Sequence, residues 1–148
     1  MNIKEQLTQT LKQALRDRDE RRKRTVRLAL AAIKNAEIDS QADLDETVIL
    51  AILQKEVKSR RETIEGAERA GREDLIAEAL AEIDILNEFL PKPLTEDELK
   101  DLAKEAVEEA GARSLKEMGN VMKIIMPRVA GRADGKEVSK IVRQLLSQ

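Results

Sequence analysis

The sequence predicts an all-α protein, and three features of it indicate that class. Its apolar residues are almost all Leu, Ile, Val or Ala, and Phe89 is the only aromatic residue among 148. Charged residues make up 38% of the chain, with only three prolines and six glycines, which favours helices. Apolar residues recur at three- and four-residue spacing. We therefore expect an N-terminal bundle of long helices followed by a small three-helix C-terminal domain.

The first two helices are expected on either side of a charged segment. The first begins near Ile3 and has an apolar residue every four positions as far as Leu15. The second includes Val26 to Ile33, where apolar residues again lie three and four apart. Between them, RDRDERRKR (Arg16 to Arg24) fits either a turn or a continuous helix, and both alternatives remain open.

Two more helices are expected after the polar connection DSQADLDE. The third begins at about Leu44 and ends at Gly71, because glycine suits the left-handed conformation that commonly follows a helix. The fourth extends from about Glu73 to Leu90 and has apolar residues at helical spacing.

The stretch LPKPL, Leu90 to Leu94, is the strongest break in the chain. Two prolines cannot continue a helix, and each one biases the residue before it toward extended geometry. We therefore place a linker at Pro91 to Pro93, between an N-terminal helical domain (1–90) and a C-terminal three-helix domain (91–148).

Three short helices are expected after the linker, each preceded by a polar residue suited to capping it. The capping sequences are TEDE at Thr95, SLKE at Ser114 and DGKE at Asp134. Glycines are expected to end the fifth helix at Gly111 and the sixth at Gly131.

Charge is unevenly distributed, although the net charge of the chain is only −2. The segment Arg16 to Arg27 has seven basic and three acidic residues, and Arg113 to Gln148 has eight basic and three acidic ones. By contrast, Thr95 to Ala110 has two basic and seven acidic residues. The low net charge therefore conceals two basic segments.

The basic C-terminal segment contains the candidate binding residues. Pro127 is expected to kink or end the sixth helix, and so to re-aim the basic side chains near the break that follows. A helix beginning at Asp134 would direct its positive dipole end toward that break, where phosphate is favoured. Six residues are the candidate phosphate contacts: Lys123, Arg128, Arg132, Lys136, Lys140 and Arg143.

Other interpretations of both basic segments stay open. Asp134 itself would compete for the amide groups at the start of the seventh helix, leaving a tight corner with solvated basic side chains. The segment Arg16 to Arg24 fits a solvated face with local ion pairs, and phosphate contacts remain the alternative there.

The composition lowers the expectation of an enzyme. The chain has no Cys, His, Tyr or Trp, which excludes thiol chemistry and removes the usual general base near neutral pH. No phosphate loop or dinucleotide fingerprint is present, and we expect no catalytic residue, metal site or cofactor.

No apolar run approaches the roughly 18 residues of a membrane span, and the polar N-terminus is unlike a signal peptide. The expected location is therefore the cytoplasm, with no membrane partner.

Four stretches match a known family pattern. They are RLALAAIKNAEID (Arg27 to Asp39), AGREDL (Ala70 to Leu75), EIDILNEFLPKPLTEDEL (Glu82 to Leu99) and MGNVMKIIMPRVAGRADGKEVSKIV (Met118 to Val142). The chain resembles a free-standing member of the GatB/YqeY family over nearly its whole length. The last stretch is similar to the C-terminal tail of the B subunit of the amidotransferase that converts Glu-tRNA(Gln) or Asp-tRNA(Asn) to the amide.

The resemblance implies a tRNA-associated helical module. In the amidotransferase the similar region binds the tRNA body, and the catalytic parts of that glutamine-dependent carbon–nitrogen ligase lie elsewhere. Two departures from the tail concern the corner: the MPRV proline is typical of free-standing members, and the tail often has proline where this chain has Gly135. The lack of aromatic residues favours recognition through phosphate and shape.

Three functions follow as hypotheses. A module for tRNA or another structured RNA predicts binding that weakens steeply with salt. A protein-interaction adaptor, with a partner in translation, would dock through the acidic fifth helix or the N-terminal domain without binding nucleic acid. An amidotransferase-type enzyme would make a glutamine-dependent product from the isolated chain.

Overall fold

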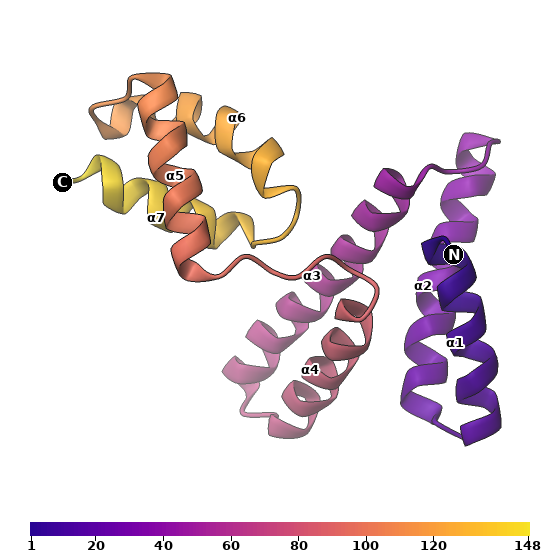
Figure 1. Cartoon of the computed structure of the whole chain (residues 1–148). Helices are drawn as coiled ribbons and strands as arrows, with labels where there is room; N and C mark the ends of the chain where they lie inside the picture. The colour runs from indigo at the N-terminus through magenta and orange to yellow at the C-terminus, as the bar shows by residue number, and fades with distance from the viewer. The chain divides into compact units, whose positions relative to one another are not determined.

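The computed structural model describes residues 1–148 and contains seven α-helices and no strand, which confirms the all-α prediction (Figure 1). The chain divides into two compact units, Met1–Leu90 and Pro91–Gln148. Each unit has its own cluster of buried apolar side chains. None of the helices combines the length and the apolar character that a membrane crossing requires.

The first unit consists of α1 (Ile3–Asp17), α2 (Glu20–Ser40), α3 (Glu46–Ala70) and α4 (Glu73–Asn87). In Figure 1, α1 lies beside α2 and α3 lies beside α4, so the unit is built from two helical hairpins. All four helices contribute to one core. Its fully buried large side chains include Leu7, Val26, Ile33, Leu53 and Leu86.

A turn separates α1 from α2, which decides between the two alternatives for the charged segment. Arg18 adopts the left-handed conformation, with φ of 56°, and Asp19 caps α2 by accepting a hydrogen bond from the Arg22 amide at 3.1 Å. The turn therefore forms without the glycine that would be the usual signal for it.

The remaining ends of this unit differ little from the prediction. Gly71 ends α3 in the left-handed conformation, as expected, with φ of 67°. The third helix begins at Glu46 because Asp45 caps it through the Val48 amide, at 3.0 Å. The fourth helix ends at Asn87, before the expected Leu90, in keeping with the bias that Pro91 imposes on the residue before it.

The second unit consists of α5 (Glu96–Ala110), a short 3₁₀ turn η1 (Leu115–Glu117), α6 (Met118–Val129) and α7 (Gly135–Leu146). Each of α5, α6 and α7 contacts the other two. Their common core includes the fully buried side chains Ala103, Val121, Ile125, Val129 and Val142. The unit is thus the small three-helix bundle that the apolar spacing predicts.

Local capping positions the first helices of this bundle. Thr95 caps α5 by accepting a hydrogen bond from the Glu98 amide at 3.1 Å, and Gly111 ends it with φ of 63°. The capping box of Ser114 and Glu117 forms, but it caps η1, which leads into α6. The sixth helix therefore does not begin directly at this box, as expected, but one short turn later, at Met118.

The corner between α6 and α7 differs from the prediction at its first residues. The helix ends at Val129, and Ala130 takes the left-handed conformation (φ 49°) ahead of Gly131 (φ 77°). The C-cap is thus Ala130, one residue before the expected glycine. Pro127 lies in the last turn of α6, where losing one amide donor interrupts only the end of the helix.

Candidate nucleic-acid interface

The six predicted phosphate contacts lie on different parts of the second unit. Their locations are the outer face of α6 (Lys123), the last turn of α6 (Arg128), the connection after it (Arg132), and α7 (Lys136, Lys140 and Arg143). Lys123 lies opposite the face of α6 that buries Val121 and Ile125, so it points away from the bundle. The structure therefore does not gather the six side chains into a single surface.

Three of the six residues share one exposed face of α7. Lys136, Lys140 and Arg143 are four and three residues apart, which places them along one side of the helix. The opposite side is buried through Val138 and Val142. With a rise of about 1.5 Å per residue, the stripe is roughly 10 Å long. We call Lys136, Lys140 and Arg143 the α7 basic face.

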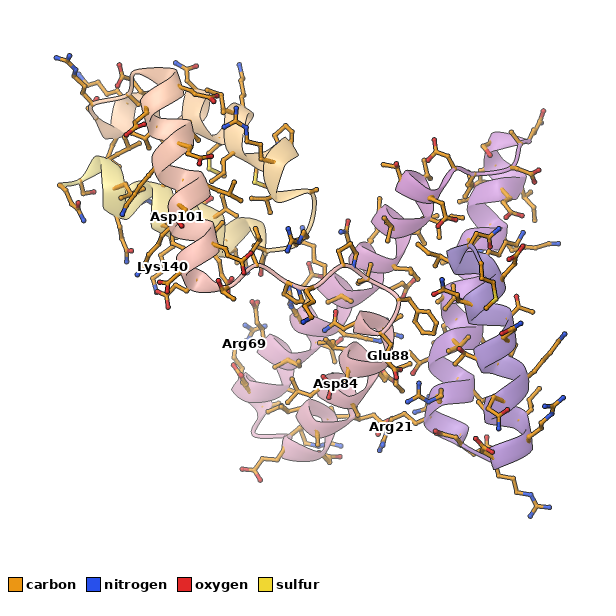
Figure 2. All side chains as sticks on the ribbon, in the orientation of Figure 1. Arg21, Arg69, Asp84, Glu88, Asp101 and Lys140 are labelled. Carbon is orange, nitrogen blue, oxygen red and sulfur yellow. The ribbon has the colours of Figure 1, made fainter.

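Two members of the α7 basic face have no competing protein partner. The side chains of Lys140 and Arg143 are exposed and make no ion pair or side-chain hydrogen bond. Lys140 is labelled in Figure 2, on α7. Because no carboxylate neutralises these two cations, they remain available to an anion from solution.

Arg128 is directed toward another helix of the bundle. Its guanidinium forms an ion pair and a hydrogen bond with the Glu109 carboxylate at the end of α5. The side chains of Arg128 and Glu109 are 37% and 51% exposed, so solvent screens the pair and it contributes little to stability. It does place the guanidinium against α5, away from the outward side of α7.

Arg132 has a structural partner that the sequence pattern did not predict. Its Nε donates a hydrogen bond to the Lys92 carbonyl oxygen at 2.8 Å, and its own carbonyl accepts one from the Leu94 amide at 2.8 Å. Its Nη2 also lies 3.9 Å from Glu98 Oε2. Arg132 therefore holds the Lys92–Leu94 segment against the corner between α6 and α7. No local signal indicates a partner 40 residues away.

The start of α7 is capped by the protein itself. Asp134 Oδ1 accepts a hydrogen bond from the Lys136 amide at 3.3 Å. This matches the alternative in which Asp134, and not a phosphate, occupies the amide groups at that helix end. Because Asp134 caps the start of α7 and Arg132 is bound to Lys92, the corner is a poorer candidate interface than the α7 basic face.

Part of the other basic segment, in the first unit, is engaged by tertiary ion pairs. Arg21, which is labelled in Figure 2, makes a two-point contact with Glu78 of α4, with its Nη2 3.0 Å from Oε2. This hydrogen bond lowers the pKa of Glu78 below its ordinary value, and the same bond raises the pKa of Arg21. Arg22 pairs with Glu88, the residue that follows α4. The expectation of local pairs is thus only partly right, because these pairs join two helices.

The same network extends into the interior of the first unit. Arg24 pairs with Glu78 and lies 3.6 Å from Glu82. Glu82 also accepts a hydrogen bond from Arg60 Nε at 2.9 Å. The side chain of Arg60 is only 10% exposed and that of Glu82 only 16%. Charges from α2, α3 and α4 therefore alternate in one continuous network.

Curated relatives of the chain come from fungi. A Pyrenophora tritici-repentis protein is 33% identical over 141 residues, which cover 92% of this chain and 76% of the relative. Proteins of Eremothecium gossypii and Kluyveromyces lactis are 39% and 40% identical over shorter matches, covering 57% and 56% of this chain. These matches span less than half of each of these two relatives, at 46% and 45%.

Each of these relatives is named altered inheritance of mitochondria protein 41, mitochondrial. Their names contradict the cytoplasmic expectation for this chain, which is therefore corrected. The expectation rested on the lack of an apolar signal, yet mitochondrial targeting segments are amphipathic and Arg-rich, so that argument does not separate the two compartments. The names state no enzymatic activity.

A family model described as Yqey-like protein matches residues 4–146, which include all seven helices of both units except Ile3, the first residue of α1. The match thus covers the α7 basic face, the Arg132 contacts and the ion-pair network of the first unit together. Because the family model matches nearly the whole chain, and because the Pyrenophora tritici-repentis relative aligns with 92% of this chain, the chain belongs to the YqeY-like protein family.

Proposed function

We propose that this protein is a tRNA-associated helical binding module of the GatB/YqeY type. The observation that carries the proposal is the α7 basic face, where Lys140 and Arg143 are exposed and make no ion pair. The relation to the tail of the amidotransferase B subunit is part of the proposal and is supported by the stretch Met118 to Val142. Residues 1–90 and 91–148 are its two domains, joined at Pro91 to Pro93.

The chemistry of the α7 basic face favours the sugar–phosphate backbone as its ligand. Three cations along roughly 10 Å of helix can contact successive phosphates of one strand. The second unit contains no aromatic side chain on which a base could stack. The proposed recognition is therefore through phosphate and shape, as is usual for double-stranded parts of RNA.

The proposal assigns no catalytic step to this chain. It has no His or Cys, and its side chains form no group of three or more acidic residues suited to a metal ion. Glutamine-dependent carbon–nitrogen ligation would be the work of other proteins to which this module delivers or holds tRNA. A protein partner in translation fits the same role.

The test is binding of purified protein to bulk tRNA at about 50 and 200 mM salt. Three phosphate contacts predict that affinity falls roughly 20- to 40-fold between these concentrations. The triple variant Lys136→Glu, Lys140→Glu, Arg143→Glu is expected to lose binding at both. Because these side chains are exposed, circular dichroism should show unchanged helicity.

A matched control changes the same charge in the other unit. Lys12→Glu, Lys34→Glu and Lys58→Glu replace three exposed cations that make no ion pair and lie outside the basic segment Arg16 to Arg27. This control is expected to retain most of the tRNA affinity. Equal losses of tRNA affinity in the two triple variants would mean that net charge alone drives binding. If the unchanged protein did not bind tRNA at about 50 mM salt, the proposal would be overturned in favour of a protein adaptor.

A further inference from the structure

A hollow of about 380 Å³ lies beside the α7 basic face, between α7 and the start of α5. Its apolar lining is formed by Leu94, Leu99 and Ile141. Its polar lining includes Glu137 and Lys140. The volume lies within the range of small-molecule sites, roughly 300–1,000 Å³. Lys140 thus belongs to both the hollow and the basic face.

The carboxylate of Glu137 has no partner within the protein. It makes no ion pair or side-chain hydrogen bond, although Lys140 follows it by only three residues on the same helix. The other carboxylate at the hollow, Glu96, is paired with Lys100 at 3.4 Å. An unpaired carboxylate beside phosphate-binding cations weakens attraction of a polyanion unless the ligand donates hydrogen bonds to it.

The donors that suit this carboxylate belong to one kind of nucleobase. A carboxylate has two acceptor oxygens and binds two parallel N–H donors well. The Watson–Crick edge of guanine presents two adjacent donors, N1–H and N2–H, whereas adenine and cytosine place an acceptor beside their donor and uracil has a single donor. An unpaired base can offer this edge to a protein, and a paired base cannot.

The rest of the hollow fits a nucleotide in the same position. The aliphatic lining offers an apolar surface for the face of a base in a unit that has no aromatic platform. Lys140, one helical turn along α7, is placed to contact the phosphate of the nucleotide whose base meets Glu137. Phosphate and base contacts would thus come from adjacent side chains of one helix.

We propose that this hollow takes an unpaired guanine of the bound RNA, with Glu137 accepting from N1–H and N2–H and Lys140 contacting the phosphate. The proposal rests on the proposed function, because it needs RNA held on the α7 basic face. It adds a base preference to recognition that otherwise depends on phosphate and shape.

The experiment compares RNA hairpins with the same stem and a single variable loop nucleotide, at about 50 mM salt. The unchanged protein is expected to prefer G over A, C or U by roughly 5- to 150-fold, the range for one good two-point base contact. The variant Glu137→Gln offers one acceptor and one donor, and should bind the four hairpins nearly equally. The control Glu105→Gln, at an exposed unpaired carboxylate of α5, should keep the preference for G.

The outcomes separate this proposal from the one it rests on. Equal binding of all four hairpins by the unchanged protein, or a G preference that survives in Glu137→Gln, would overturn the assignment of the hollow and leave the RNA module standing. No binding to any hairpin would overturn both. Guanosine monophosphate, which cannot reach Lys136 and Arg143 together, should bind at least about tenfold more weakly than the G hairpin. Equal affinity would assign the hollow to a free nucleotide.

Discussion

The two basic segments of this protein resemble one another in sequence and differ in what the fold does with them. In the first unit, Arg21 and Arg24 pair with Glu78 of α4, and Arg22 pairs with Glu88, the residue after α4. Three arginines of the same segment make no ion pair: Arg16, Arg18 and Arg27. In the second unit, Lys140 and Arg143 make no ion pair. Equal charge density therefore does not mean equal availability to an anion. Tertiary pairing decides which cations can bind a ligand.

The pairing in the first unit serves the packing of its helices. Arg60 and Glu82 are nearly buried and hydrogen-bonded to each other at 2.9 Å. A buried charge is tolerated only when a partner satisfies it. In this unit, some of the basic residues therefore serve internal cohesion and are not available as an outward-facing surface.

The largest effect on stability is expected from breaking the nearly buried ion pair between Arg60 and Glu82. Glu82→Leu leaves the Arg60 guanidinium nearly buried with fewer partners, and should lower the free energy of unfolding by about 3 kcal/mol. Chemical denaturation of the full chain measures it. The double variant Arg60→Met, Glu82→Leu removes both charges and should recover most of the loss. If the double variant were as unstable as the single one, packing and not charge pairing would explain the defect.

A smaller effect tests whether ion pairing limits the affinity of the first unit for RNA. Glu78→Gln removes the carboxylate that neutralises Arg21 and Arg24. The freed guanidinium groups should raise affinity for bulk tRNA roughly two- to fivefold at about 50 mM salt. Glu105→Gln removes the same charge without freeing an arginine, and an equal gain in that control would attribute the change to net charge.

The smallest effect concerns the acid dependence of stability. The Arg21 hydrogen bond lowers the pKa of Glu78 in the folded protein. The stability that this group contributes is therefore present above its unfolded pKa, about 4.5, and is lost as pH falls through the lower folded value. Thermal unfolding from about pH 6 to 3 should show a shallower loss in Glu78→Gln than in the unchanged protein.

A second variant checks the cause of this pH dependence. Arg21→Met combined with Arg24→Met removes the partners of Glu78 and keeps the carboxylate. It should flatten the acid dependence as Glu78→Gln does. An unchanged slope in both variants would show that other carboxylates dominate acid unfolding.

Several local features were predictable because their causes lie within a few residues. Gly71 and Gly111 end helices in the left-handed conformation, and Thr95 and Asp134 cap helices through nearby amides. Apolar spacing likewise indicated the core-facing sides of the helices. These signals were sufficient for the all-α class and for most helix ends to within a few residues.

The exceptions are positions where packing outweighed local preference. Arg18 and Ala130 take the left-handed conformation although neither is glycine, at a local cost of roughly 1 kcal/mol each. A sequence pattern places such a turn at the nearest glycine, which is why Gly131 was expected to end α6. The buried residues on either side, such as Val129 and Val138, determine where the chain must turn.

By itself, the sequence determined the all-helical class, the capping residues and the two concentrations of basic charge, because helix propensity, capping and charge depend on neighbouring residues. Only the tertiary structure decided which basic residues remain available. Arg132 meets Lys92 across 40 residues, and Arg21 meets Glu78 across 57. Such pairings depend on how helices pack, and packing is set by the whole buried surface and not by any local pattern.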